Sequence, residues 1–507
     1  PKQIIVNGLE ALLSSQACLL KLPCGHKMIK LAAQKQMENI SHNPDYHGIF
    51  SDKRLDQRGN KIGSILLSAR KSSIKGSTKN EADQKGFYRF LENTRVEEQQ
   101  LVKEITQRCG DNAEGRHVYV LGDTSSIGLN DHRNRIKAQS GVGLVGNKTG
   151  IGFLVHCNLV IDAFSQNLLG FSDIYLWHRE EDKANNTTRV YKKQTIEEKE
   201  SYRWIQSGLN SKEVLSTAQS ITIVEDREGD IYEQFCIVPD EKTHLVIRSR
   251  DNRNLSNGEK LYDSLAAEPL AGCYSFDVEA DKRKGQKKRT VHVEVRYRRV
   301  LIQKPAGRLS KEIPKERVLY AVEAKEINGP KKDSVKWRIL TTHTVVSFEQ
   351  ALYIINIYRQ RWNIEQVFRL LKRQGFRIED SELSTGWAIR KLTVLLLNNV
   401  LRVIQLLLAY GKEDSQPIDE VFSNDELSCL KSLSQQYEQK ETQVKNIFPV
   451  DKLAWASWVI ARLGGWKGYI RQRPPGPITL KRGVDNFGLI YQGWLLAKQN
   501  EKDVSTR

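Results

Sequence analysis

Three acidic residues, Asp123, Asp226 and Glu365, stand at positions from which their carboxylates could converge. Asp123 follows the apolar run 118–122 and Asp226 follows the run 221–225, so each is expected at the end of a β-strand. Glu365 lies in a long predicted helix. Carboxylates are preferred ligands of hard divalent cations, and a pair of such cations activates water and stabilises the leaving oxygen in phosphodiester cleavage. The pattern therefore indicates metal-dependent chemistry on a phosphodiester.

The helix expected over residues 348–373 carries further residues suited to this chemistry. At about 100° per residue, Tyr358, Arg361, Glu365 and Lys372 fall within one stripe about 60° wide. Arginine can grip a phosphate with two hydrogen bonds, lysine acts as a point charge, and tyrosine can hydrogen-bond or stack. The opposite side of the helix is apolar and is expected to be buried: Ile364, Val367, Phe368 and Leu371.

Each of these signals also has a plainer interpretation. The stripe could be a solvated face whose Arg361–Glu365 pair contributes only a few tenths of a kcal/mol, although Trp362 beside it is unusual for such a face. An aspartate at a strand end is often only a turn or cap residue. Near Asp226, the acidic residues 225, 228 and 230 are equally placed, and spacing alone does not choose among them.

The charge of the chain points to nucleic acid as the phosphodiester. The formal net charge is +18, and basic residues cluster at 282–289 and at 296–299, where a tyrosine is interleaved. A basic balance alone can serve solubility, but clustering favours a polyanionic partner held through counterion release. The stretch 53–75 is also rich in Arg and Lys, which suits either a DNA-reading helix or a solvated helix face.

The chain of 507 residues is expected to form about three regions. Residues 1–110 are predicted to be helical, 111–373 to be an α/β core with a β-rich insertion at about 240–345, and 374–507 to be helical. Strands are predicted within the core over 118–121, 151–161, 168–176 and 221–224. A helix is predicted over 195–209, because residues 195–198 resemble a capping box.

Composition excludes several classes of protein. With 39% hydrophobic and 28% charged residues the chain is not largely disordered. No apolar stretch approaches the roughly 20 uncharged residues of a membrane span, so 392–408 is interpreted as a buried helix. No signal-peptide pattern is seen, and the seven scattered cysteines predict reduced thiols in a cytoplasmic protein. Cys18, Cys24 and His26 could supply three zinc ligands, but no second cluster completes a tetrahedral site.

These motifs together resemble bacterial cut-and-paste DDE transposases of the insertion-sequence-four family, transposon-five type. The Tyr-x2-Arg-x3-Glu-x6-Lys signature of that family is met without departure at 358–372. Residues 123–126 look like its first-aspartate motif and 226–232 like its second, which selects Asp226. The likeness extends to 87–93 and 460–465 and covers roughly residues 50 to 500.

The resemblance implies an RNase H-like catalytic core interrupted by the β-rich insertion. Asp123, Asp226 and Glu365 would bind two Mg²⁺ or Mn²⁺ ions per active site. Water would nick one strand at each transposon end, and the freed 3′-hydroxyl would attack the opposite strand to form a hairpin. A second water would open the hairpin, and the 3′-ends would then attack target DNA. All of these steps are phosphoryl transfers that need in-line geometry.

The resemblance also implies a set of DNA contacts. Tyr358, Arg361 and Lys372 would hold phosphates near the hairpin, and Trp337 would stack on a flipped base, although its pattern in the sequence also suits the core. The remaining candidate contacts to double-stranded DNA are Arg369 on the same helix and, nearer the N-terminus, Arg58, Arg70, Lys71 and Arg89. The C-terminal helices would form a homodimer in the synaptic complex, and the protein would act in the bacterial cytoplasm at the nucleoid.

Two departures from the family pattern are visible: the first 49 or so residues have no clear counterpart, and the Pro-Pro-Gly-Pro stretch at 474–477 is unfamiliar. Two other functions remain open at this point. A catalytically silent DNA-binding relative would inhibit transposition or serve a domesticated role. A metal-dependent nuclease of another kind would cut DNA without joining it.

Overall fold

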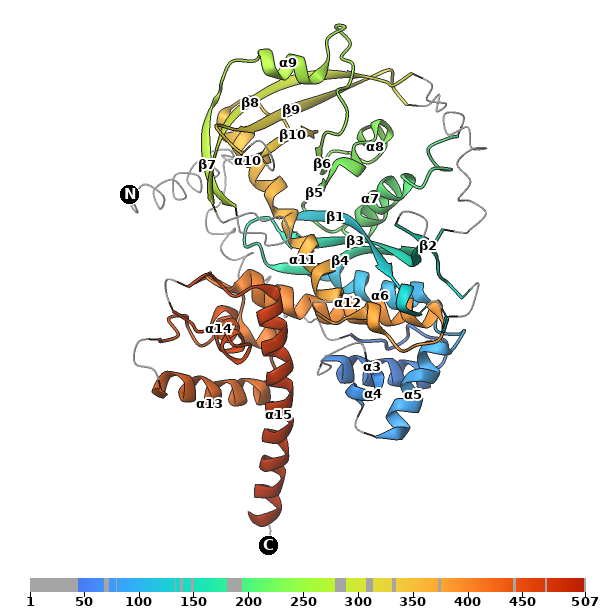
Figure 1. The fold of residues 1–507 in the computed structure, drawn as a ribbon, viewed down its shortest axis with the longest axis vertical. Helices are drawn as coiled ribbons and strands as arrows, with labels where there is room; N and C mark the ends of the chain where they lie inside the picture. The colour runs from blue at the N-terminus through green and yellow to red at the C-terminus, as the bar shows by residue number, and fades with distance from the viewer. Residues whose placement is uncertain are drawn as a thin grey trace. The chain divides into compact units, whose positions relative to one another are not determined.

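A computed structural model gives the structure of the protein (Figure 1). It describes residues 44–67, 73–78, 80–132, 134–136, 140–146, 150–179, 194–278, 289–306, 313–330, 334–372, 375–440, 444–469 and 472–505. Residues 41–507 form one compact unit. Within this unit the described parts of the three expected regions are continuous, and the boundaries at 110 and 373 stay predictions.

The core is a mixed β-sheet with the strand order β4-β3-β1-β5-β6. β3 runs antiparallel to both β1 and β4, whereas β5 runs parallel to β1 and β6 parallel to β5. This arrangement is that of an RNase H-like α/β core, and the strands predicted from apolar runs are confirmed. The bounds are β1 His117–Gly128, β3 Gly150–Asp162, β4 Leu168–Trp177, β5 Ser220–Glu225 and β6 Thr243–Arg248, with short β2 Gly143–Val145 on β3.

The β-rich insertion continues this sheet rather than forming a second one. β10 pairs with β6, and β9, β8 and β7 follow in order, so the sheet has ten strands in all. Strict alternation explains β8, where Val291, Val293 and Val295 are buried. The insertion was expected from about residue 240, but β6 pairs with β5 and so belongs to the core sheet. The inserted strands therefore begin only after Arg248. Their bounds are β7 Gly272–Val278, β8 Arg289–Gln303, β9 Glu316–Glu326 and β10 Lys336–Thr341, with α9 at Leu261–Ala267.

Helices cover the core sheet and continue to both sides of it (Figure 1). α6 and α12 pack on β4, and α7 packs on both β4 and α6. α12 is long and apolar enough to cross a membrane, but 83% of its apolar window is buried inside the protein, as in a core helix. The bounds are α6 Glu98–Asn112, α7 Tyr202–Val214, α8 Tyr232–Ile237, α10 Phe348–Gln360, α11 Trp362–Leu371 and α12 Gly386–Ala409.

The described residues that flank the sheet are mostly helical, whereas the helical prediction for residues 1–43 lies outside the described residues. Their helices are α3 Lys53–Leu67, α4 Ile74–Ser77 and α5 Glu81–Glu92 before the sheet, and α13 Asn424–Lys440, α14 Leu453–Leu463 and α15 Pro477–Ser505 after it. α3 and α5 pack on α12, and so do α14 and α15. α12 is therefore the shared support of the N-terminal and C-terminal helices.

Two helix predictions were wrong in detail. The helix expected from Thr195 begins at Tyr202, because residues 195–201 form turns although Glu198 does accept the backbone N–H of Thr195 (2.8 Å). The helix expected over 348–373 is interrupted at Arg361. There the N–H of Arg361 donates to the carbonyl of Tyr358, three residues back, which tightens the turn and separates α10 from α11.

Candidate active site

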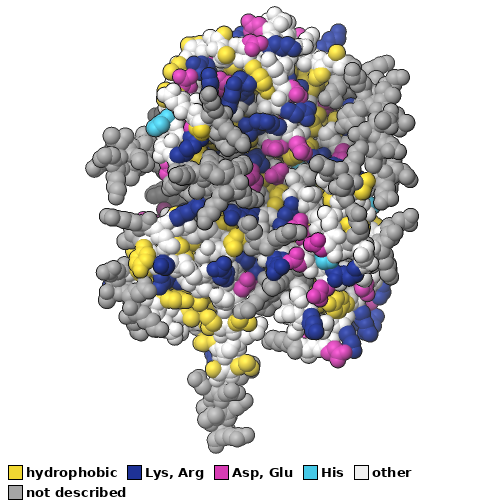
Figure 2. All heavy atoms as spheres, in the orientation of Figure 1, with side chains coloured by type: hydrophobic (Ala, Val, Ile, Leu, Met, Phe, Trp, Pro, Cys, Tyr) yellow, Lys and Arg dark blue, Asp and Glu magenta, His cyan; other side chains and the backbone are white. Residues whose placement is uncertain are grey.

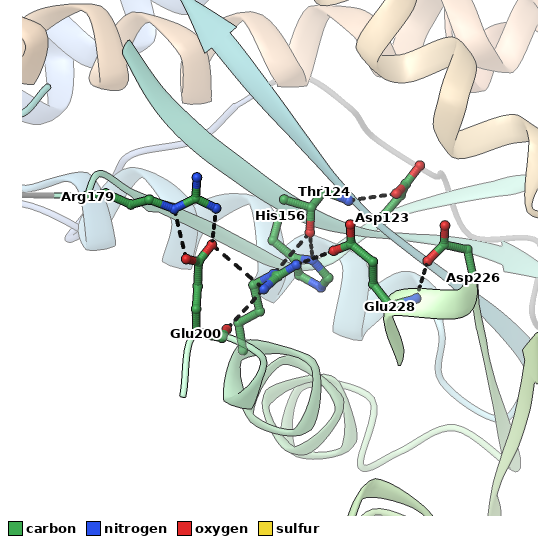
Figure 3. A network of polar contacts seen from close by, with 8 residues as sticks. Asp123, Thr124, His156, Arg179, Glu200, Asp226 and Glu228 are labelled. Atoms are coloured by element: carbon green, nitrogen blue, oxygen red, sulfur yellow. Dashed lines mark hydrogen bonds and ion pairs between the residues drawn. The ribbon is translucent and has the colours of Figure 1, made fainter. Parts of the chain in front are cut away.

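Asp123 and Asp226 are brought together by two neighbouring parallel strands. In the register of β1 and β5, Leu121 lies beside Val224, and each aspartate follows two residues later. β5 ends just before Asp226, as expected, but Asp123 lies within β1, which continues to Gly128, so the prediction of a strand end was wrong for Asp123. The parallel pairing of the two strands places the aspartates side by side. Figure 3 shows the two carboxylates next to each other at this edge.

Backbone amides fix the orientation of both carboxylates. The N–H of Thr124 donates to Oδ1 of Asp123 at 2.8 Å. The N–H of Glu228 donates to Oδ1 of Asp226 at 2.8 Å, which makes Asp226 the N-cap of the short 3₁₀-helix η4, Arg227–Gly229. One oxygen of each carboxylate therefore accepts a hydrogen bond from a backbone amide of a following residue.

Arg361 brings the third carboxylate to this edge. Its Nη1 donates to Oδ2 of Asp123 at 3.2 Å, and its Nη2 forms an ion pair with Glu365. α11 also packs on β1. The predicted proximity of Glu365 to Asp123 is thus achieved through a guanidinium between them.

Lys372 supplies a second link between the end of α11 and β1. Its Nζ donates to Oγ of Ser125, two residues after Asp123, at 2.7 Å. Burial lowers the pKa of Lys372, and the nearby Glu379 and Asp123 oppose that shift. The lysine therefore lies beside the carboxylates as expected, but in this structure it contacts a hydroxyl of the core.

The position of Tyr358 differs from the expectation. The helical wheel placed Tyr358 on the exposed stripe, yet it is 5% exposed and packs into the core. Its ring lies 5.6 Å from that of Trp337, edge to face, and Trp337 stacks on Phe276 at 5.3 Å. The wheel was wrong for Tyr358 because the extra strands cover the face of α10 that the wheel left open.

The other predicted DNA contacts are dispersed. Arg369 is exposed on the last turn of α11, close in sequence to Glu365. Arg58 on α3 and the exposed Arg89 on α5 belong to the N-terminal helices and do not join the carboxylates. Outside the described residues lie Arg70 and Lys71, and the zinc candidates Cys18, Cys24 and His26.

The donor set fits a hard divalent cation in its chemistry. Burial raises the pKa of Asp123 to about 6, Arg361 opposes that shift, and the charges of Asp226 and Glu365 add to it. A cation would relieve this crowding of negative charge. Within the described part of the chain no group of three acidic, His or Cys side chains closes into a ready metal site, and Arg361 bridges two of the carboxylates instead.

The burial of Asp123, together with the nearby charges of Asp226 and Glu365, predicts a pH-dependent stability. Because its pKa lies above the usual 3.8, the folded state is favoured when Asp123 is protonated, and this contribution is lost as pH rises through about 6. An upward shift of this size corresponds to about 2 to 3 kcal/mol. Asp123→Asn should therefore raise the thermal midpoint at pH 7.5 in EDTA and change it little at pH 4. A midpoint difference that is the same at both pH values would contradict this account.

Arg203, which the sequence did not single out, contacts residues next to both aspartates. Arg203 on α7 donates from Nε to Oγ1 of Thr124 at 3.2 Å and forms an ion pair with Glu228. No spacing rule marked this arginine, because it lies in the helix whose start was misplaced. Ser125, the partner of Lys372, was likewise recognisable only from the fold.

The surface around the site is divided by charge. On the face drawn in Figure 2, Lys and Arg side chains gather over the extra strands and again over the helices of the other half. A small group of acidic side chains lies between these two areas. A polyanion that spans the face would meet cations on both sides of a carboxylate group.

Comparison with known proteins agrees with this geometry. One solved structure that is similar is that of a piggyBac transposase synaptic complex with hairpin DNA, determined by cryo-electron microscopy. It shares 9% sequence identity, with a TM-score of 0.32 over 85% of this chain and 75% of that chain, a likeness too slight to carry a conclusion. Residues 47–96 match the transposase DNA-binding family, and residues 73–398 match the transposase DDE domain. Since the second match covers most of the chain, including all three carboxylates, the protein belongs to the DDE transposases.

Proposed function

We propose that this DDE transposase is of the insertion-sequence-four family, transposon-five type. It binds the terminal inverted repeats of its element and cuts each end by nicking, hairpin formation and hairpin opening. It then joins the 3′-ends to target DNA. The observation that supports the proposal is the pair Asp123 and Asp226 side by side, with Glu365 linked to Asp123 through Arg361 and with Lys372 bound to Ser125 nearby.

The three carboxylates are the proposed catalytic residues. Divalent metal ions serve DDE transposases generally, and in this site two Mg²⁺ or Mn²⁺ ions would supply an activated water and neutralise the leaving oxygen. Asp123 and Asp226 would hold their ligand oxygens in fixed directions, because backbone amides already occupy Oδ1 of each. Glu365 would complete the set once Arg361 turns from the carboxylates to a phosphate of the bound DNA.

That exchange gives Arg361 two partners of similar chemistry. In the free protein its guanidinium bridges Asp123 and Glu365. A phosphate oxygen accepts the same paired hydrogen bonds as a carboxylate. DNA binding and the release of the carboxylates would then be one event, so that the site becomes fully acidic only when its substrate is present.

The remaining DNA contacts are proposed from the same resemblance. Lys372 and Tyr358 would contact phosphates near the cut, and Trp337 would stack on the flipped base. Arg58 and Arg89 would contact the transposon end, since residues 47–96 match a transposase DNA-binding family. Two copies of the chain would pair through the C-terminal helices, and the work would take place at the bacterial nucleoid.

Two rival functions use the same surface differently. A silent DNA-binding relative would gain nothing from carboxylates that face phosphates, because like charges repel. Another metal-dependent nuclease would need the carboxylates but neither paired ends nor strand joining. The retained carboxylates disfavour the first rival, and the match to the DDE domain disfavours the second.

A strand-joining assay tests the proposal. The protein is incubated with Mg²⁺, a supercoiled plasmid and oligonucleotides copied from the inverted repeats that flank its gene. The proposal expects oligonucleotide 3′-ends covalently joined to the plasmid. Specific binding without joining would favour the silent relative, and cutting without joining would favour the nuclease.

Replacement of Trp337 tests the hairpin step. Trp337→Ala should slow hairpin formation by about tenfold or more, since stacking on one base is worth about 1–3 kcal/mol. First-strand nicking needs no flipped base and should change much less. Both rates are read from one gel time course on end-labelled DNA. Equal slowing of the two steps would assign Trp337 a packing role on Phe276 and Tyr358 instead.

A further inference from the structure

Arg203 contacts residues next to both aspartates, Thr124 and Glu228, whose positions Figure 3 shows. Its Nε donates to Oγ1 of Thr124, the residue directly after Asp123, at 3.2 Å. Its Nη2 forms an ion pair with Glu228, whose backbone N–H holds the carboxylate of Asp226. A single guanidinium therefore contacts both Thr124 and Glu228.

The guanidinium is itself held in place. The side chain of Arg203 is 11% exposed, and its Nη1 donates to the backbone carbonyl of Glu200 at 3.0 Å. Its Cζ lies 5.4 Å from the ring centroids of both Trp177 and Trp204. The carboxylate of Glu200 is bound by Arg179 at 2.7 Å. These contacts restrict the side chain of Arg203 to one conformation, in which it reaches both Thr124 and Glu228.

The hydroxyl of Thr124 is oriented by the same network. Its Oγ1 accepts from Arg203 and shares a second hydrogen bond with Nδ1 of His156, 2.9 Å away. His156 is fully buried, and burial together with the charge of Arg203 lowers the pKa of this imidazole to about 3. The histidine is therefore neutral at physiological pH. The Thr124 side chain, which follows Asp123 in β1, is therefore held by both Arg203 and His156.

This support is needed because the backbone ladder ends early. The last paired residues of β1 and β5 are Leu121 and Val224, two positions before the aspartates. Beyond that point β1 and β5 no longer pair with each other, although Asp123 stays paired with Cys157 of β3. Arg203 forms its contacts directly after this end of the ladder.

We propose that Arg203 is a positioning residue that fixes the separation of Asp123 and Asp226 and thereby sets the affinity of the site for divalent cations. This inference rests on the proposed function, which places the cation at these aspartates. The arginine itself acts through Thr124 and Glu228 and contacts no reacting atom.

Cation binding without DNA provides the test. Mn²⁺ affinity of the full chain is measured by electron paramagnetic resonance of the free ion for the wild type, Arg203→Ala and Asp226→Asn. Loss of residues that orient metal ligands typically weakens binding by 10-fold to 100-fold, so Arg203→Ala should bind Mn²⁺ about tenfold more weakly. Its affinity for transposon-end DNA, measured by gel shift in EDTA, should stay unchanged.

Arg402→Ala is the matched control. Arg402 is 12% exposed, pairs with Glu426 and lies 4.5 Å from the ring of Phe422, but it belongs to the far part of α12. It should lose comparable thermal stability without losing Mn²⁺ affinity. Arg203→Lys, which keeps the charge and can restore one of the hydrogen bonds, should recover part of the affinity.

A double variant tests the route of the effect. If Arg203 acts through Glu228, then Arg203→Ala combined with Glu228→Ala should bind Mn²⁺ no more weakly than the worse single variant. If Arg203→Ala bound Mn²⁺ as tightly as the wild type, the inference alone would be overturned. The same would follow if Arg203→Ala and Arg402→Ala lost equal Mn²⁺ affinity. If Asp226→Asn bound Mn²⁺ as tightly as the wild type, the cation site of the proposed function would be overturned instead.

Discussion

Glu365→Gln is expected to abolish DNA cleavage while leaving transposon-end binding intact. The amide keeps the size of the side chain and can still contact Arg361, so α11 should hold its place. It cannot supply the negative charge that a metal ligand needs. Losing about 4 kcal/mol of transition-state stabilisation lowers a rate roughly a thousandfold, and loss of a metal ligand is of that order. Single-turnover nicking of end-labelled DNA in Mg²⁺ measures the effect.

The control is Glu349→Gln, an exposed residue in the first turn of α10. It makes the same chemical change two turns or more away from the carboxylates and should cut like the wild type. Nicking by Glu365→Gln at a tenth of the wild-type rate or faster would remove Glu365 from the metal site. Loss of end binding in the same variant would show that the substitution had disturbed the fold.

Arg253→Ala is expected to destabilise the protein by about 3–5 kcal/mol, because it leaves the buried carboxylate of Asp230 without its cationic partner. Asp230 is fully buried, and Arg253, itself 8% exposed, forms an ion pair with it. Backbone amides of Arg250 and Asp251 also donate to Asp230, which anchors the start of the insertion to the second-aspartate motif. Removing the arginine leaves this carboxylate with those two amides alone. Urea unfolding at pH 7.5 measures the loss.

Arg250→Ala is the neighbouring control. Its ion pair with Asp251 is half exposed, at 51% and 57%, and its backbone amide stays in place after the substitution. An exposed pair of this kind contributes about 0–1 kcal/mol. If Arg250→Ala and Arg253→Ala destabilised the protein equally, burial of Asp230 would not be the source of the effect.

Much of the catalytic edge was predictable from the sequence because its elements are locally encoded. The strands that carry Asp123 and precede Asp226 are short apolar runs, and such runs form strands largely through their own burial. Glu365 was recognisable from its signature with Arg361 and Lys372. The parallel register that aligns the two aspartates followed from the fold class, not from any single residue.

What the sequence did not predict depends on partners far along the chain. Tyr358 is buried because Trp337 and the insertion pack on α10, and a helical wheel contains no information about that cover. The role of Arg203 follows from Thr124 and Glu228, which lie on two other elements. Charged residues give little periodic signal, so their pairings appear only when the elements are placed in space.

The way the insertion extends the sheet has a consequence for folding. β6 ends at Arg248, and its outer edge is paired by β10, which begins only at Lys336. Until that later segment is made and docked, the edge of β6 offers unpaired backbone groups to any neighbouring strand. Pairing across so long a stretch of chain is slow, because loop closure must precede it. Glu365 follows β10 in the chain, so during synthesis the last of the three candidate carboxylates emerges only after the strand that pairs with this edge.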